Sequence, residues 1–274
     1  MRKSERNFLS PHPRIVTRLM IVYGLFVVGC AAQQDDVQRL RAGYDALGAR
    51  QFDEALAAAD VVLADSPKDT LPAEAHYLRG RVFEERAIAN VQGGTAHLQT
   101  ARTEYVASIG LPHKPDLDGR ARAGVANVAF HQDDYATALD QWSAAYDKLE
   151  RPEDKLLTLY QLGRTAQRLG KWEEADRYLA SVQSAAPGTD LAAKARQIQG
   201  MRGFIVQFAT FSSRKQADAA IVELQKQGIT AQHFIDPANV GLDLVRVGSV
   251  RTYVEAKALK TRFSGQYTAI VIIP

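Results

Sequence analysis

Few side chains in this sequence are spaced for catalysis. The metalloprotease pattern HExxH, the nucleophile elbow GxSxG and the dinucleotide-binding pattern GxGxxG do not occur in it. The nearest approach to a phosphate-binding loop, Gly170-Lys171-Trp172, lacks the glycine spacing and the hydroxyl residue of a P-loop. The histidines that follow residue 30 show no metal-ligand spacing; they are His76, His97, His113, His131 and His233. We therefore expect no enzyme, no metal site and no cofactor.

Two pairs of adjacent glutamates are the remaining candidates for acid–base chemistry. Glu84-Glu85 and Glu173-Glu174 lie in segments with helical periodicity. We interpret both pairs as solvated helix surface rather than as catalytic carboxylates.

Polar residues in strand-like segments near the C-terminus are better candidates for binding. Phe204–Phe211 (FIVQFATF) and residues 242–247 (LDLVRV) are rich in apolar, β-branched and aromatic residues. Alternation places Gln207 on the free face of the first segment and Arg246 on that of the second. Such a face can bind a polar polymer, because aromatic rings cover apolar sugar faces while amide and guanidinium groups hydrogen-bond to hydroxyls and carbonyls.

These segments belong to two similar halves, offset by 39 residues. Each half has the order strand, helix, strand, which predicts a small α+β domain of type βαββαβ over residues 201–274. Its helices cover one face of an antiparallel four-stranded sheet. The expected strands are 204–211, 229–235, 242–247 and 267–273. The residues expected on the free face are Ile205, Gln207, Ala209, Gln232, Phe234, Leu244, Arg246, Tyr267 and Ala269.

Residues 204–212 (FIVQFATFS) and 244–249 (LVRVGS) resemble the two hallmark segments of the SPOR domain. The resemblance covers residues 203–274 and implies an RNP- or ferredoxin-like fold that binds peptidoglycan glycan strands stripped of stem peptides, which are abundant at division septa. It also implies that Gln207, Thr210 and Arg246 contribute to binding. The expected site consists of these three residues and of Ile205, Phe234 and Tyr267 from the same face. The sequence departs from the family at Ala209, where Gly or Ser is usual, and at Ser249, where Pro is frequent.

Residues 37–200 have the periodicity of helices, and their pattern repeats. Small residues, an aromatic residue and a proline recur in one frame, as in Gly43, Phe52, Ala55 and Pro67, and again in Gly163, Trp172, Ala175 and Pro187. This frame resembles the tetratricopeptide repeat, in which small residues let two helices approach closely. We expect an all-α solenoid of about four units, with a closing helix at residues 191–199.

A solenoid of this kind presents a concave groove lined by residues of the first helix of each unit. The expected groove residues are Tyr77, Arg81, Asn127, Tyr160 and Arg164, with Phe130 and Gln167 beside them. They carry no recognisable ligand signature. The groove is therefore predicted either to bind an unidentified protein partner or to serve as a spacer.

The first 29 residues have the features of a lipoprotein signal peptide. Basic residues precede an apolar run at 19–29, which is too short for a membrane span of about 20 residues. Val27-Val28-Gly29-Cys30 resembles the lipobox, which implies lipidation of Cys30 and a short linker over residues 30–36. An ordinary secretory signal and an uncleaved anchor are the alternatives. Ala31 in place of Asp favours the outer membrane.

The net charge gives no support for nucleic acid as a ligand, and the lipobox argues against RNA because a periplasmic domain would not meet it. Removing residues 1–29, with five basic residues and one acidic, changes the net charge from +3 to −1. We expect a non-enzymatic lipoprotein on the periplasmic face of the outer membrane that binds denuded glycan, at the division septum, and a protein partner through its repeats. The alternative is an envelope assembly scaffold in which the C-terminal domain is only a tether to the wall.

Overall fold

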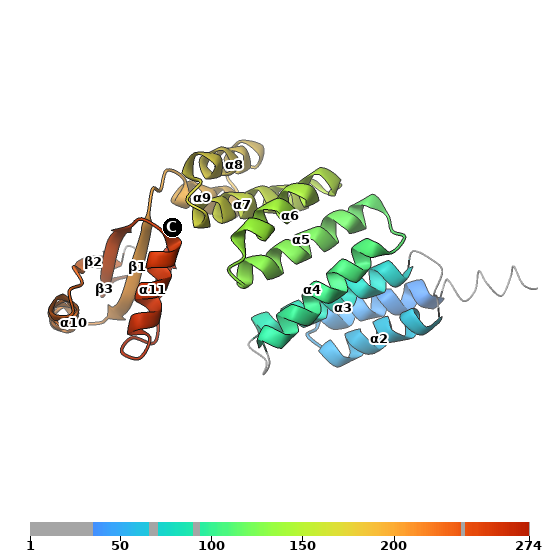
Figure 1. Cartoon of the computed structure of the whole chain (residues 1–274), viewed down its shortest axis with the longest axis horizontal. Coiled ribbons are helices and arrows are strands. Elements are labelled where there is room, and N and C mark those ends of the chain that lie inside the picture. The colour runs from blue at the N-terminus through green and yellow to red at the C-terminus, as the bar shows by residue number, and fades with distance from the viewer. Residues whose placement is uncertain (1–34, 66–70, 90–93, 237–238, 274) are drawn as a thin grey trace, which may run out of the picture. The chain divides into compact units, whose positions relative to one another are not determined.

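The computed structural model describes residues 35–65, 71–89, 94–236 and 239–273 (Figure 1). These residues form two compact units, one that ends at His113 and one that begins at Lys114. The predicted signal peptide, Cys30 and Pro67 lie outside the described residues. No helix of the described part is both long enough and apolar enough to cross a membrane.

The first unit is helical, and its helices pack in sequence order. A helix over residues 35–48 precedes three others, which are α2 (Phe52–Asp65), α3 (Leu71–Ile88) and α4 (Gly94–Gly110). The core between the first three of these helices includes Leu40, Val62 and Leu78. Tyr105 of α4 is fully buried and donates a hydrogen bond to the Glu84 carboxylate. Glu84 is only 5% exposed, so its interpretation as solvated surface was wrong.

The second unit begins with helices and ends with a sheet. Its helices are α5 (Pro115–His131), α6 (Tyr135–Lys148), α7 (Pro152–Arg168), α8 (Trp172–Ala185) and α9 (Asp190–Ile198). Proline stands at the first position of α5 and of α7, where its missing N–H costs no helical hydrogen bond. Asp134 caps α6 by accepting from the Thr137 amide, and Thr189 caps α9 in the same way. The closing helix lies within one residue of its predicted position.

Small residues lie at the helix contacts; Gly43 and Gly163 are predicted by the repeat frame, and Gly80 is a further one. A Cβ atom on Gly80 would lie 2.7 Å from the Tyr105 ring, and one on Gly163 would lie 2.7 Å from Leu179. Gly43 is similarly close to Leu78. Bulkier side chains would push these helices apart, which is the physical basis of the repeat pattern. The helical part is therefore consistent with packed repeats.

The remaining elements form the predicted βαββαβ domain. They are β1 (Phe204–Phe211), α10 (Arg214–Lys226), β2 (Gln232–Asp236), β3 (Asn239–Val250), α11 (Tyr253–Phe263) and β4 (Val271–Ile273). The strands pair antiparallel in the order β2-β3-β1-β4. Buried Phe204, Val206 and Phe208 pack against α10 and α11 residues such as Leu224 and Phe263. The predicted fold class, helices followed by a small α+β domain, is confirmed.

The bounds of three strands differ from the prediction. β2 covers Gln232–Asp236 rather than 229–235, and β3 covers Asn239–Val250 rather than 242–247. β3 continues to Val250 through the expected turn, where Ser249 takes a φ of 61°. β4 begins at Val271 rather than Tyr267, because residues 264–269 form turns. The fourth strand is thus a short edge strand, and this changes which side chains it contributes to the sheet.

Candidate functional site

The two inner strands bring the candidate binding residues together. Gln207 of β1 is the cross-strand partner of Arg246 of β3. The Arg246 Nε donates to the Gln207 Oε1 at 2.9 Å, and the Gln207 Nε2 lies 3.4 Å from the Thr210 Oγ1, to which it donates. The amide of Gln207 therefore links the guanidinium to the hydroxyl on one face of the sheet.

An aromatic ring and aliphatic side chains extend this face. Phe234 of β2 is 41% exposed, and the Arg246 Cζ lies 5.6 Å from its ring centroid, within the range of a cation–π contact. On the other side of β1, Gln207 pairs with Val271, which is 48% exposed. Ile205 pairs with Ile273. We call this surface the sheet face; it consists of Ile205, Gln207, Thr210, Phe234, Leu244, Arg246 and Val271.

A β-bulge determines which β1 residues reach the sheet face. The register shifts between Gln207 and Ala209, so Ala209 pairs with Val245, a residue of the helix-side core, and Thr210 pairs with Leu244. Cross-strand partners share a face, so Ala209 faces the helices and the prediction that it points outward was wrong. The same bulge places Thr210 beside Gln207, whereas uninterrupted alternation would have placed it on the helix side.

Tyr267 does not lie on the sheet face. It precedes β4 in a turn, and its ring packs against Phe208 at 5.6 Å, among the residues on the helix side of the sheet. Burial, and then the charge of Glu223, raise the pKa of its phenol. The prediction misplaced Tyr267 because it began the fourth strand four residues early. Val271, which pairs with Gln207 and lies on the sheet face, was not among the residues expected there.

The expected groove residues of the second unit gather around one aromatic contact. Arg164 on α7 lies over the rings of Phe130 and Tyr160, at 4.9 and 5.8 Å from their centroids. Asn127 on α5 is half-buried. Gln167 is fully buried, and its Nε2 donates to the Ile198 carbonyl at 2.6 Å, so it joins α7 to α9 and cannot line a groove.

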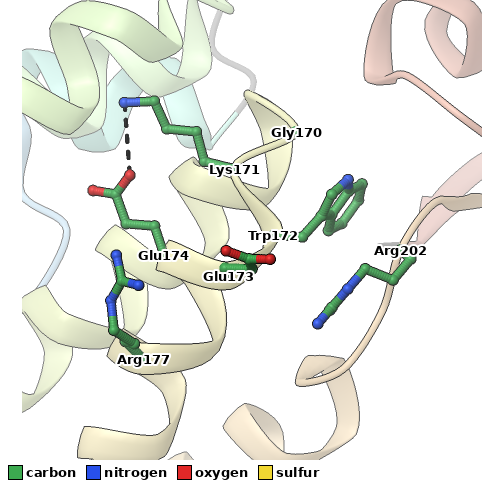
Figure 2. A pocket seen from close by; sticks show the side chains of 7 residues that line it. All are labelled: Gly170, Lys171, Trp172, Glu173, Glu174, Arg177 and Arg202. Atoms are coloured by element: carbon green, nitrogen blue, oxygen red, sulfur yellow. Dashed lines mark ion pairs between the residues drawn. The ribbon is translucent and has the colours of Figure 1, made fainter.

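A small pocket of about 400 Å³ lies at the start of α8 (Figure 2). Lys171, Glu174 and Arg177 contribute to it from α8 and its approach, and Arg202 reaches it from the segment before β1. Lys171 and Glu174 form an ion pair at 3.7 Å, and Arg202 is paired with Asp176. The charges of this pocket largely neutralise one another, so it offers no distinct ligand chemistry.

The expected groove residues of the first unit are partly buried. Tyr77 is 6% exposed, and its ring lies 5.7 Å from that of Tyr105. Burial alone would lower the pKa of Arg81, but its interactions with Tyr77, Tyr105 and Glu84 outweigh burial and raise it. The Arg81 side chain is half-exposed, and it also forms an ion pair with Glu85 at 3.3 Å.

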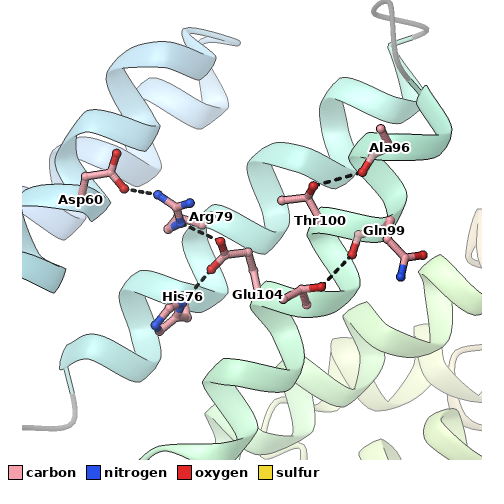
Figure 3. Close-up of polar contacts among 8 residues, drawn as sticks. Asp60, His76, Arg79, Ala96, Gln99, Thr100 and Glu104 are labelled. Atoms are coloured by element: carbon pink, nitrogen blue, oxygen red, sulfur yellow. Dashed lines mark hydrogen bonds and ion pairs between the residues drawn. The ribbon is translucent and has the colours of Figure 1, made fainter.

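An ion-pair network ties three helices of the first unit together (Figure 3). Arg79 of α3 pairs with Asp60 of α2 and donates from Nε to the Glu104 Oε1 of α4 at 2.9 Å. The His76 Nδ1 lies 2.6 Å from the other Glu104 oxygen. Burial would raise the pKa of Glu104, but hydrogen bonds from His76 and Arg79 hold it below its ordinary value. This arrangement is structural, since each group is engaged by another helix.

The described residues contain no cluster of three or more His, Cys, Asp or Glu that could hold a metal ion. What the sheet face offers instead is a row of amide, guanidinium and hydroxyl groups bordered by an aromatic ring. These groups can donate and accept hydrogen bonds along an extended polar ligand while the ring covers an apolar patch of it. The fold and this face define a non-catalytic binding module.

Comparison with known protein families identifies the module. The family model of the SPOR domain matches residues 200–273, which include both helices and all four strands of the sheet domain. The predicted SPOR domain is thereby confirmed. It is a non-catalytic domain that binds peptidoglycan, and it associates the protein with the cell envelope. A search of curated proteins found no match to the chain.

Proposed function

We propose that this protein is a non-enzymatic lipoprotein of the outer membrane that binds denuded glycan strands of peptidoglycan, at the division septum, through its SPOR domain. The observation that carries the proposal is the joined group of Gln207, Arg246 and Thr210, bordered by Phe234, on the face of the sheet that the helices leave free.

The chemistry of this face suits a glycan without stem peptides. A sugar polymer presents hydroxyl and acetamido groups along its edges and apolar C–H patches on its ring faces. Arg246 and Gln207 supply oriented donors and an acceptor, and Phe234 supplies a planar apolar surface. An open sheet face can contact a glycan strand along its length. Stem peptides on the glycan would keep it at a distance from the sheet.

The lipid attachment is proposed at Cys30. The apolar run and the sequence Val27-Val28-Gly29-Cys30 support it, and several acyl chains on one residue would give stable anchoring, since each buried CH₂ contributes about 0.8 kcal/mol. Mass spectrometry of the protein from its native membrane should find an acylated N-terminal cysteine. A free thiol at Cys30 would contradict the anchor without affecting the proposed glycan site.

The helical part is proposed to bind a protein partner. Arg164, Phe130 and Tyr160 form a half-buried cluster of a cation and two rings, a combination that recurs in protein interfaces. In the alternative function, an envelope assembly scaffold, the helical part does the main work and the SPOR domain serves only as a tether to the wall.

Sedimentation with purified sacculi tests the glycan proposal. We expect the protein to bind sacculi treated with an amidase, which removes the stem peptides, more tightly than untreated sacculi. The control is the same protein centrifuged without sacculi, which should stay in the supernatant. Equal binding to both preparations would overturn the proposed specificity and leave the tether alternative.

A further inference from the structure

The helices and the SPOR domain of the second unit meet at a cluster of aromatic rings. Tyr253 at the start of α11 lies 5.3 Å from the ring of Tyr135 on α6 and 5.6 Å from that of Phe204 on β1. Trp172 of α8 lies 5.3 Å from Phe204. The Arg168 guanidinium at the end of α7 stacks on Tyr253 at 4.1 Å. These contacts hold α11 against the ends of α6 and α7.

This contact leaves an open hollow of about 910 Å³ beside α11. Residues from three places in the sequence line it, so neither the helices nor the SPOR domain would form it alone. The lining residues include Tyr135, Arg168, Leu169, Val254, Ala258 and Arg262. All the α11 residues that line the hollow, apart from Tyr253, are exposed.

Exposed apolar residues give the hollow the character of a docking surface. Val254 is 77% exposed and Leu169 is 38% exposed. Val254, Ala258 and Thr261 follow one another at intervals of four and three residues, so they form one stripe along α11. An apolar stripe of this kind next to a hollow can receive an apolar side chain of a partner.

The charges around the hollow define the chemistry of that partner. Both nearby carboxylates are already engaged: Asp133 by Lys257 and by the Tyr135 hydroxyl, and Asp134 by the Thr137 amide as the cap of α6. The lining carries three cations, Arg168, Lys257 and Arg262, against these two carboxylates, so it has a surplus of one positive charge.

Arg168 adds a half-buried cation that is incompletely hydrogen-bonded. Its Nη1 is shielded from solvent and has no hydrogen-bond partner among the described residues. Burial lowers the pKa of its guanidinium, which reflects the loss of water around the charge. The lining thus has a surplus of positive charge with apolar side chains beside it.

We propose that this hollow is a docking site for an acidic peptide segment of another protein, which inserts one apolar side chain between Val254 and Leu169 and places carboxylates beside Arg262 and Arg168. The site lies on the helix side of the SPOR sheet, so an occupant would leave the sheet face free for glycan. The inference does not depend on the proposed glycan specificity, and it differs from the groove expected around Arg164.

Short synthetic peptides test the proposal with the whole protein. Each peptide carries one central Leu, Phe or Trp, flanked by Asp and Glu, by Ser and Gln, or by Lys and Arg, and binding is followed by fluorescence anisotropy. We expect the acidic set to bind and the neutral and basic sets to bind at least about tenfold more weakly, with affinity that falls as salt rises. Binding by none of the acidic peptides, or equal binding by all sets, would overturn the proposal.

Paired variants locate the binding. Val254→Asp and Arg262→Glu should each weaken the acidic peptides by about tenfold or more. Their controls are Val222→Asp and Lys215→Glu, which change exposed residues of α10 in the same domain and should leave binding unchanged. An Asp in the first turn of α11 is compatible with the helix dipole, so Val254→Asp should fold. Equal losses in test and control variants would overturn the site.

Two further measurements separate this inference from other outcomes. Sedimentation with digested sacculi should be the same for all four variants, so a failure of glycan binding would be recognised independently. In sedimentation equilibrium, Val254→Asp should leave the oligomeric state of the protein unchanged. Self-association that Val254→Asp abolishes would identify a second copy of this chain as the occupant and contradict the peptide proposal.

Discussion

Arg246 owes its position to three neighbours. Gln207 accepts from its Nε, Phe234 lies beneath its guanidinium, and the pairing of β3 with β1 and β2 fixes its backbone. A guanidinium held in this way is preorganised, so less side-chain entropy is lost when it binds a ligand. Its contribution to binding should therefore exceed that of an unrestrained arginine.

Replacing Arg246 with alanine should weaken binding to amidase-digested sacculi by about tenfold or more, since an oriented donor and a ring contact are lost together. Sedimentation with sacculi measures the loss, and a fluorescent fusion should show reduced septal enrichment. Arg251→Ala is the matched control, because Arg251 is an exposed arginine just after the same strand. Identical binding by both variants and the unmodified protein would show that the sheet face is not the glycan site.

Glu104 should make the stability of the first unit depend on pH. Its folded-state pKa lies below the ordinary value, so its contribution is present at neutral pH and is lost as the pH falls through the folded-state pKa. Glu104→Gln should lower the free energy of unfolding by about 1–2 kcal/mol at pH 7, because Arg79 and His76 lose a charged acceptor.

Urea unfolding at neutral and acidic pH measures this effect. The difference between Glu104→Gln and the unmodified protein should shrink once the pH is below the folded-state pKa. Glu54→Gln, which changes an exposed glutamate on α2, should have little effect at either pH. A gap that stays constant across the range would show that the ion pairs contribute nothing specific.

At the scale of elements, the close contact of α3 with α4 depends on Gly80. A Cβ at this position would lie 2.7 Å from the fully buried ring of Tyr105, which has no space into which it can move. Gly80→Ala should therefore lower the free energy of unfolding by about 1–3 kcal/mol despite the better helix propensity of alanine. Chemical denaturation measures this change.

Gly110→Ala is the control for the contact. A Cβ on Gly110, at the end of α4, would meet no atom within 4 Å. This substitution should be neutral or should stabilise the protein by up to about 1 kcal/mol. If Gly80→Ala behaved like Gly110→Ala, the small residue at position 80 would not be set by helix packing.

At the scale of the whole molecule, Trp172 of α8 packs against the core of the SPOR domain. The segment between α9 and β1 is short, and Asp176 of α8 accepts from the Gly200 amide and from Arg202. Phe204, the first residue of β1, is fully buried and lies next to Trp172. The last helices and the sheet therefore belong to one compact unit, and they should stabilise one another.

Trp172→Ala should loosen the SPOR domain although the substitution lies outside it. The loss of a half-buried ring should destabilise the unit by about 2 kcal/mol, below the usual cost for a fully buried aromatic residue. Hydrogen–deuterium exchange should show faster exchange in peptides from β1 and α11. Phe234→Ala removes an exposed ring from the sheet face and should leave these peptides unchanged. Unaltered exchange in Trp172→Ala would show that the helices and the SPOR domain fold independently.

Local patterns of residues were enough to predict the helices, the strands and the fold class. Helical periodicity, the small residues at 43 and 163 and the doubled strand–helix–strand pattern are local features, and each reflects a requirement of backbone geometry or close packing. The placement of Gln207 and Arg246 on the same face of the sheet was also predictable, because alternation along each strand decides which side its residues face.

The neighbours that shape the sheet face and the surfaces that remain open depend on contacts between distant segments. The bulge after Gln207 turned Ala209 inward and Thr210 outward, and the late start of β4 left Tyr267 outside the sheet. The hollow beside α11 joins residues from three segments of the chain, and the last segment, 253–262, lies more than 80 positions after the other two. Register and docking arise from contacts between distant segments, and a local pattern of residues carries no information about the partner that a segment will meet.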